Sequence, residues 1–391
     1  MNFPSQLSAG DRPPTAPRST PGAIYAVILK IAAPCNLNCS YCYVYNHQDK
    51  SYRTRPIFIS EAVSERVWEV ISDYCDRRGQ HTMGITFHGG EPTLIGAKRL
   101  DLLARRAKDV LGHRLRGLSI QTNATLIDQD WIDVFQKNDV KVGVSLDGPR
   151  EVNDMFRVDH SGRGSYEKVI AGLSCLQNNN LDPSILCVVN PTLSGADTFR
   201  YFLSLGIRRM NFLLPDATHD SKQRLYGHLG ATPVADYLIP AFDAWFDLDD
   251  PDVKISLFTD FLRMMMGGES ETDAFSNPLM SYVVIETDGS IEALDALRVC
   301  EENIASSGLN VVTHGLDDLH LGRPLLPRAI HEGFALTDVC QRCAERDLCG
   351  GGYLPHRYAR TNGFDNPSVW CLDILKLLGH IRGRLEQAAH S

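Results

Sequence analysis

The chain has 391 residues and a formal net charge of −9 at pH 7, and 43% of its residues are hydrophobic. This composition is typical of one large or two ordinary globular domains. The negative charge argues against broad binding to nucleic acid or to anionic membranes. No stretch approaches the ~20 apolar residues of a membrane helix, and the first 22 residues lack the apolar core of a secretory signal. We therefore expect a cytoplasmic protein that has neither nucleic acid nor a membrane as its partner.

The N-terminal half of the chain alternates short β-rich runs with amphipathic helical stretches. Before it, residues 1–22 are rich in Pro, Ser, Thr and Gly, and we expect a disordered arm there. The pattern predicts strands at residues 24–31, 83–88, 118–123, 142–148, 184–190 and 210–215. It predicts helices at residues 60–75, 100–111, 129–138, 166–177 and 196–206. Ser60 is placed to cap the first of these helices.

Regular alternation of apolar strands and helices predicts an α/β fold with a parallel sheet covered by helices. Six such units fit a partial (β/α)6 TIM-like barrel, and they also fit an open doubly wound sheet. In both arrangements functional groups collect at the C-terminal ends of the strands. The expected division of the chain is an arm of residues 1–22, a core of 23–230, a helical bridge of 231–275 and a loop-rich domain of 276–391.

Cysteine use is the most informative feature of the sequence. Eleven cysteines in a chain without an export signal are more often metal ligands than disulfides. The first group, Cys35, Cys39 and Cys42 in "CNLNCSYC", follows the first predicted strand. Its spacing matches no common zinc site. Three thiolates suit a [4Fe–4S] cluster that keeps one iron open to a small molecule; the alternative is three unligated thiols on a loop.

Residues suited to binding a small molecule follow the second predicted strand. The segment "HGGEP" (88–92) contains Gly89, Gly90, Glu91 and Pro92. The two glycines allow backbone to approach a ligand closely, although the same pair can simply form a turn. The Glu91 carboxylate can accept an ammonium group. This segment is therefore a candidate half of a cofactor site.

The next two strand ends add further polar groups. The segment "QTNAT" (121–125) includes Asn123, and "SLDGP" (145–149) includes Ser145 and Asp147. A hydroxyl and a carboxylate at this place suit the hydroxyls of a ribose, although Asp147 can also cap a helix. Farther along, Arg157 can clamp a carboxylate through two parallel hydrogen bonds. Together with the cysteine loop, these strand ends predict a cofactor site.

The cysteine triplet, with Tyr41 directly before Cys42, resembles the radical S-adenosylmethionine superfamily over residues ~23 to 215. The resemblance implies that Cys35, Cys39 and Cys42 hold a [4Fe–4S] cluster whose open iron binds the methionyl amine and carboxylate. It places the glycine motif near the amine, Tyr41 near adenine, Ser145 near ribose and Arg157 near the carboxylate. It also implies that the cluster splits the sulfonium and that the resulting 5′-deoxyadenosyl radical removes a hydrogen atom.

The second cysteine group is Cys340, Cys343, Cys349 and Cys371. Four thiolates make a closed site, and by spacing alone zinc competes with an iron–sulfur cluster. The tail is similar to the SPASM extension of peptide-modifying radical enzymes, in which these four positions bind the outer auxiliary [4Fe–4S] cluster.

The chain departs from this pattern where Leu294 and Tyr353 replace two cysteines of the inner auxiliary cluster. We therefore expect two clusters in all. Cys300 either rescues a reduced inner cluster or is an unligated thiol.

The segment "YVVIETDGSIEAL" (282–294) predicts a hairpin with Asp288 and Gly289 at its turn. Asp295 follows it directly. In some SPASM enzymes the aspartate at this position accepts a proton, so the resemblance makes Asp295 the candidate catalytic base. The alternative is a solvated aspartate at the end of a hairpin.

The C-terminal segment "CGGGYLPHRYARTNGFDNPSVWC" is similar to the FxsB-type maturases of ribosomal peptides, several of which resemble cyclophane synthases. Within it, His356, Arg357 and Tyr358 either line a peptide channel or support the cysteine loop. This resemblance implies a C–C cross-link between an aromatic ring and a β-carbon of a precursor peptide, with an external flavodoxin- or ferredoxin-type reductant. Alternatives are thioether formation, epimerisation, formylglycine-forming sulfatase maturation, and a zinc-stabilised scaffold that binds peptide without turnover.

Overall fold

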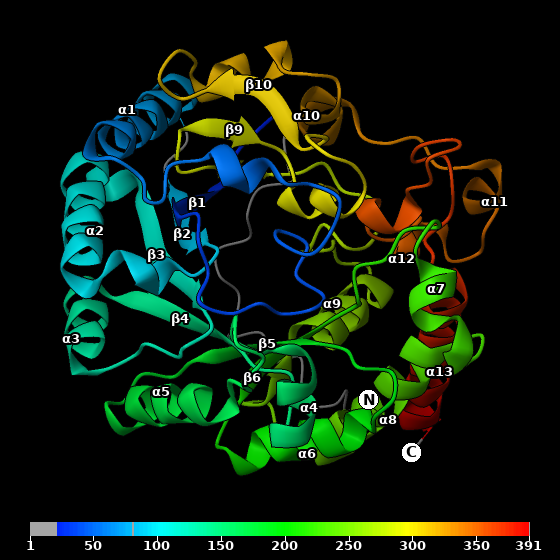
Figure 1. Ribbon diagram of the computed structural model, residues 1–391. Coiled ribbons are helices and arrows are strands. Elements are labelled where there is room, and N and C mark those ends of the chain that lie inside the picture. The colour runs from blue at the N-terminus through cyan, green and yellow to red at the C-terminus, as the bar shows by residue number, and fades with distance from the viewer. Residues whose placement is uncertain (1–21, 80–81, 391) are drawn as a thin grey trace.

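The protein is described by a computed structural model that covers residues 22–79 and 82–390 (Figure 1). All but one residue of the predicted arm therefore lie outside the described residues. The described strands form one ten-stranded sheet in the order β10-β9-β8-β1-β2-β3-β4-β5-β6-β7. The first seven strands in chain order are β1 (Ala26–Ala32), β2 (Met83–Gly89), β3 (Leu115–Thr122), β4 (Val140–Ser145), β5 (Ser184–Val188), β6 (Arg209–Leu213) and β7 (Lys254–Ile255).

The spatial order of the strands separates the two predicted architectures. Strands β1 to β6 are parallel and lie next to one another in chain order. A doubly wound sheet would reverse its order at a switch point, whereas a barrel wall keeps the chain order. The partial (β/α)6 barrel is therefore confirmed, and β7 extends it at one edge.

The helices cover the outer side of the curved sheet, as Figure 1 shows for α1, α2, α3 and α5. The longer helices are α1 (Glu61–Arg78), α2 (Ala97–Leu111), α3 (Gln129–Asn138), α4 (Arg150–Phe156), α5 (Tyr166–Asn178), α6 (Gly195–Ser204), α8 (Pro233–Leu248), α9 (Ser256–Met265) and α13 (Cys371–His390). The predicted cap of α1 is present, because Ser60 Oγ accepts a hydrogen bond from the Val63 amide at 3.2 Å. Helix α4 was not predicted from the sequence.

The predicted hairpin consists of β8 (Tyr282–Ile285) and β9 (Ser290–Glu292), which pair antiparallel. Gly289 closes its turn with a φ of 84°. Strand β8 also pairs parallel with β1, and β10 (Ser306–Asn310) pairs with β9. The hairpin thus continues the sheet of the barrel, while the proposed division of the chain into domains remains a prediction.

The last helix ties the C-terminus back to the barrel. Asp373 in the first turn of α13 accepts hydrogen bonds from two amides at the start of α8, those of Val234 at 2.8 Å and Ala235 at 3.0 Å. Since Cys371 is the first residue of α13, this contact fixes one of the C-terminal cysteines. In the described part of the chain, no helix has both the length and the apolar character needed to cross a membrane.

Candidate active site

The first cysteine group lies on a loop that directly follows β1. Backbone amides hold the loop to the end of α4 and the segment after it, because Ser40 N donates to Phe156 O at 3.0 Å and Asn38 N donates to Val158 O at 2.7 Å. The Cys35 thiol interacts electrostatically with the thiols of Cys39 and Cys42. The structure therefore brings together the three predicted ligands.

The chemistry of these thiols suits a cationic cluster. Burial raises the pKa of Cys35 to about 12 and that of Cys42 to about 11. A buried thiolate needs a positive partner, and the irons of a cluster provide it. Within the described residues, no group of three or more His, Cys, Asp or Glu side chains is arranged to hold a metal ion. Three thiols on one loop are nevertheless the donor set that a cluster bound by three thiolates would need.

The glycine motif fastens the end of β2 to this loop. Gly90 N donates to Ala32 O at 2.8 Å, and Glu91 N donates to Pro34 O at 2.9 Å. A Cβ on Gly89, whose φ is 154°, would lie 2.1 Å from Ala32 O, and one on Gly90 would lie 2.4 Å from Pro34 O. Backbone of the cysteine loop occupies the space that a side chain would need. The two glycines therefore permit this close approach.

Glu91 is fully engaged inside the protein. Its Oε1 accepts hydrogen bonds from the Thr93 amide at 3.0 Å and the Thr122 hydroxyl at 2.7 Å, and its Oε2 accepts from the Asn123 amide at 2.7 Å. The carboxylate thereby joins the 3-10 turn Pro92–Ile95 to the end of β3. Such a carboxylate positions the strand ends, and its predicted contact with an ammonium group remains a prediction.

Asn123 reaches the cysteine loop from β3. Its Nδ2 donates to Asn36 Oδ1 at 2.8 Å and lies 3.9 Å from Cys35 Sγ. On β4, Ser145 Oγ accepts a hydrogen bond from Gln121 Nε2 at 2.9 Å. Two successive strand ends thus present the predicted small polar groups on the side of the cysteine loop.

Tyr41, Asp147 and Arg157 form one buried cluster. The Tyr41 hydroxyl donates to Asp147 Oδ2 at 2.5 Å and accepts from Arg157 Nη1 at 2.8 Å. Asp147 Oδ1 accepts from the Val188 amide at 3.1 Å, so the carboxylate joins β5 and does not cap α4. Arg157 is 7% exposed, and its Nε lacks a hydrogen-bond partner within the described chain. An unpaired buried guanidinium nitrogen suits a carboxylate ligand.

Asp295 lies beside β1. It is only 8% exposed, so it is not a solvated hairpin residue. Its Oδ2 accepts a hydrogen bond from the Tyr43 hydroxyl at 2.9 Å and pairs with Lys30 Nζ at 3.0 Å. Burial is the largest single effect and acts to raise the pKa of Asp295, but the neighbouring cationic groups, Lys30 foremost, together outweigh it and hold the pKa well below the usual range. The carboxylate is therefore ionised, and both contacts engage its Oδ2.

The sequence analysis missed three residues around Asp295. Lys30 also pairs with Glu286 at 2.9 Å. It is the single charged residue in the predicted strand 24–31, and this feature of the sequence could have identified it as a functional residue. Tyr43 lies one residue after Cys42. His88 interacts electrostatically with Asp295, and burial lowers the pKa of its imidazole. All three lie where β1 and β2 end.

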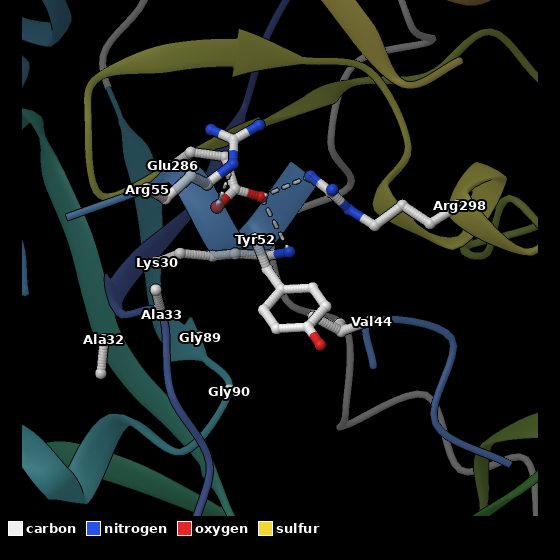
Figure 2. A pocket seen from close by; sticks show the side chains of 10 residues that line it. All are labelled: Lys30, Ala32, Ala33, Val44, Tyr52, Arg55, Gly89, Gly90, Glu286 and Arg298. Carbon is white, nitrogen blue, oxygen red and sulfur yellow. Dashed lines mark hydrogen bonds and ion pairs between the residues drawn. The ribbon is translucent and has the colours of Figure 1, made fainter. Parts of the chain in front are cut away.

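A pocket opens between the cysteine loop and the hairpin. Figure 2 shows Lys30, Arg55, Glu286 and Arg298 at one side of it, with Gly89 and Gly90 below. Arg298 Nη2 donates to Glu286 Oε1 at 2.8 Å, and Arg55 Nη2 donates to Glu292 Oε1 at 2.6 Å. These buried ion pairs join the hairpin to Arg55 and to the 3-10 turn Asp295–Val299, and thus hold Asp295, the first residue of that turn, in place.

The second cysteine group is also brought together. The Cys349 thiol interacts electrostatically with those of Cys371, Cys340 and Cys343, and burial raises its pKa to about 12. A Cβ on Gly350, which has a φ of 58°, would lie 2.2 Å from Asn277 N. The tight turn after Cys349 therefore depends on glycine. Four thiols, those of Cys340 and Cys349 buried and those of Cys343 and Cys371 half-buried, form a donor set for a closed site.

The positions that depart from the SPASM pattern lie nearby. Leu294 is 3% exposed and belongs to the apolar core. The Tyr353 ring packs edge-on against His356, with ring centroids 5.2 Å apart. Cys300 is buried, and its Sγ lies 3.9 Å from Pro355 O, where the thiol donates a weak hydrogen bond. Apolar and aromatic groups thus occupy both substituted positions.

Comparisons with known proteins agree with this geometry. The family model described as "Radical SAM superfamily" matches residues 30–203. The cysteine-type anaerobic sulfatase-maturating enzyme of Clostridium novyi (strain NT) is 29% identical over 359 residues, which cover 88% of this chain and 91% of that protein. The serine-type anaerobic sulfatase-maturating enzyme of Bacteroides thetaiotaomicron is 25% identical over 362 residues, covering 86% and 84%.

Solved structures share the fold. Native anSMEcpe with bound AdoMet has a TM-score of 0.82 at 22% identity, covering 94% of this chain and 100% of that one. Streptococcus suis SuiB bound to precursor peptide SuiA has a TM-score of 0.56 at 16% identity, covering 89% and 76%.

The matched segment runs from Lys30 to the end of α6 and contains the cysteine triplet, the glycine motif and Arg157. The predicted cofactor types, S-adenosylmethionine and [4Fe–4S] clusters, are those of this family. The chain is an enzyme whose residues 30–203 match the model of the radical SAM superfamily.

Proposed function

We propose that this enzyme oxidises one side chain of a peptide or protein, and that conversion of a cysteine or serine to formylglycine is the first candidate. The observation that carries the proposal is the contact of Asp295 with Tyr43 and Lys30, which puts an ionised carboxylate beside the three-cysteine loop. The similarity to both cysteine-type and serine-type sulfatase-maturating enzymes over most of the chain supports this choice of substrate.

The overall chemistry defines what the protein must provide. Oxidation of a serine –CH2OH to –CHO removes two hydrogens as one hydrogen atom, one electron and one proton. The same loss from cysteine gives a thioaldehyde, and water converts it to the aldehyde with release of hydrogen sulfide. The site must therefore bind the cofactor, accept a proton and accept an electron.

Residues around the first cysteine loop fill the first two roles. In this proposal Cys35, Cys39 and Cys42 hold the first cluster, which together with S-adenosylmethionine supplies the radical that removes the hydrogen atom. The free Nε of Arg157 binds the methionyl carboxylate, and Tyr41 and Asp147 hold the guanidinium in place. Asp295 takes the proton, and Lys30 keeps the carboxylate ionised and fixed.

The third role belongs to the C-terminal cysteines. Cys340, Cys343, Cys349 and Cys371 would hold the auxiliary [4Fe–4S] cluster. Four thiolates leave no open iron, so electron acceptance suits this group better than binding of substrate. A flavodoxin- or ferredoxin-type protein would return the electron needed at the first cluster. In this division, residues 23–230 form the radical SAM core and residues 276–391 the SPASM-like auxiliary domain.

A second candidate is the C–C cross-link between an aromatic ring and a β-carbon of a precursor peptide. This reaction also removes two hydrogens as one hydrogen atom, one electron and one proton. The same residues would therefore have the same roles in it. The observation that favours it is the departure at Leu294 and Tyr353, which separates this chain from the SPASM pattern. The comparisons support sulfatase-type maturation better.

Anaerobic turnover with defined peptides tests the proposal. The reconstituted enzyme is incubated with S-adenosylmethionine, a chemical reductant and one of three peptides, which carry a cysteine, a serine at the same position, or an aromatic three-residue motif without either. We expect an aldehyde that reacts with a hydrazide probe from the first two peptides. Loss of two hydrogens from the third without an aldehyde would instead establish the cross-link. Formation of 5′-deoxyadenosine with no change in any peptide would overturn both candidates.

A further inference from the structure

Arg357 is a buried cation whose role the sequence left open between a peptide channel and support of the cysteine loop. It is 1% exposed and is the last residue of the 3-10 turn Leu354–Arg357, which begins five residues after Cys349. Its Nε donates to Phe364 O at 3.2 Å and to Asn366 O at 3.3 Å, and its Nη2 donates to Ala335 O. Three carbonyls therefore hold the guanidinium in one orientation.

The remaining nitrogen is the informative one. Nη1 of Arg357 is buried and has no hydrogen-bond partner in residues 22–79 or 82–390. A buried donor without an acceptor is costly, at about 1–3 kcal/mol, so an acceptor is expected there once the site is complete. The side chain interacts electrostatically with the thiols of Cys340 and Cys349. The unpaired nitrogen thus belongs to a side chain that lies beside two of the four predicted ligands.

We propose that Nη1 of Arg357 donates a hydrogen bond to a sulfur of the auxiliary cluster held by Cys340, Cys343, Cys349 and Cys371, and that this contact raises the reduction potential of that cluster. The inference rests on the proposed auxiliary cluster and is independent of which peptide is modified. Arg357 is a positioning and tuning residue, since it touches neither substrate nor S-adenosylmethionine.

The direction of the effect follows from charge. Reduction adds one negative charge to a cluster already bound by four thiolates. A buried cation stabilises the more negative form more strongly, because the low dielectric of the interior strengthens the interaction. Hydrogen bonds to sulfur act in the same direction on cluster potentials. Arg357 therefore makes the cluster a better acceptor of the electron released during oxidation of the substrate.

A redox titration followed by electron paramagnetic resonance tests this inference without any peptide. The variants are Arg357→Gln, which removes the charge, and Arg357→Lys, which keeps the charge but loses the several N–H donors of the guanidinium. The control is Arg346→Gln, because Arg346 lies between Cys343 and Cys349 and is half-exposed in a pair with Asp347. The signal of the first cluster is the internal reference.

We expect a lower midpoint potential of the auxiliary cluster in Arg357→Gln, a smaller decrease in Arg357→Lys, and no change in Arg346→Gln or at the first cluster. An unchanged potential in Arg357→Gln with full iron content would overturn the proposal. If the midpoint potentials shift as expected but no peptide is oxidised, the result would contradict the proposed function and leave the role of Arg357 standing.

If Arg357→Gln fails to retain iron, the unmodified enzyme decides the question. Protein labelled with 15N-arginine and reduced at the auxiliary cluster is expected to show a 15N hyperfine coupling in pulsed resonance spectra. Absence of that coupling would overturn the hydrogen bond. A total of only about four irons per chain in the unmodified enzyme would show that the auxiliary cluster is absent, and it would thereby overturn this inference.

Discussion

The cysteine loop after β1 and the cysteine loop near the C-terminus both bury thiols with raised pKa values, but their surroundings differ. Side chains from several strand ends surround the first loop, and Arg157, which directly follows α4, keeps an unpaired nitrogen. Backbone turns and one buried arginine surround the second loop. The first environment is suited to a ligand that comes and goes, whereas the second is suited to a closed group that only exchanges electrons.

The mechanical support of the two loops differs as well. The first is docked onto β2 through the amides of Gly90 and Glu91 and therefore rests on the rigid sheet. The second follows turns such as that at Gly350, and a single long helix, α13, anchors its last cysteine. We infer that the first loop takes its shape from the sheet, while the second takes more of its shape from the metal it binds.

The largest expected effect is loss of the first loop's function. Cys42→Ala removes one of three thiolates, and a cluster with two ligands is not retained. We expect formation of 5′-deoxyadenosine to fall to background and iron content to fall by about four per chain. Iron analysis and chromatography of the nucleoside measure both. Nucleoside formation close to the wild-type rate would contradict the assignment of this loop.

The matching change in the second loop should separate the two roles. Cys343→Ala disrupts the auxiliary site and leaves the barrel untouched. We expect 5′-deoxyadenosine to form near the wild-type rate while oxidised peptide nearly disappears, because the electron has no acceptor. The ratio of nucleoside to product is the measurement. If both activities fall together, the two loops are not functionally distinct.

Asp295→Asn removes the proton acceptor and keeps the shape of the side chain. Lys30 retains its partner Glu286, so the variant should fold. We expect product formation to fall by roughly 100-fold or more, the scale of a positioned base, while 5′-deoxyadenosine continues to form. The matched control is Asp288→Asn at the hairpin turn, which belongs to the same charge network through Arg55. Equal losses in both variants would assign the effect to the network and not to the base.

Arg157→Lys tests whether the first site binds S-adenosylmethionine through Arg157. Lysine keeps the charge but cannot make two parallel hydrogen bonds. A hydrogen bond to a charged group contributes about 1.5–3 kcal/mol, so we expect the KM for S-adenosylmethionine to rise roughly 10- to 100-fold. The auxiliary cluster should keep its potential. An unchanged KM would show that Arg157 does not bind the cofactor.

The smallest expected effect concerns pH. Burial acts to raise the pKa of Asp295, but Lys30 and the other cationic groups around it together hold the pKa well below the usual range. A carboxyl whose pKa is depressed in the folded enzyme loses its charge only when the pH falls through that low value. The ratio of product to 5′-deoxyadenosine should therefore stay flat between about pH 6 and pH 8. An acid limb in this ratio would identify a different base, and His88 would be the first to examine.

The sequence predicted the barrel well, because apolar runs and helix caps are local signals. Ser60 caps α1 as expected, and Gly289 closes the hairpin as expected. The contact of Lys30 with Asp295 could not be predicted in the same way. It depends on β8 pairing parallel with β1, which is a choice between distant strands that no local pattern specifies.

The sequence identified residues of the candidate site, but it predicted their hydrogen-bond partners less well. The chemistry of Glu91 suggested an ammonium contact, whereas the structure engages both of its oxygens with β3 and the 3-10 turn. Similarly, Asp147 lies at a helix start in the sequence but bonds to β5. In both cases a long-range partner uses the carboxylate, and such partners are visible only when the strands are assembled.

Strand β1 has a neighbour on each side, β2 and β8, along most of its length. Its amides should thus exchange with deuterated solvent among the slowest in the molecule, even before iron is added. The binding site of the first cluster would then already be folded in the newly synthesised chain, before iron is bound. During maturation, assembly of the barrel can precede delivery of iron, and the C-terminal loop would complete its folding afterwards.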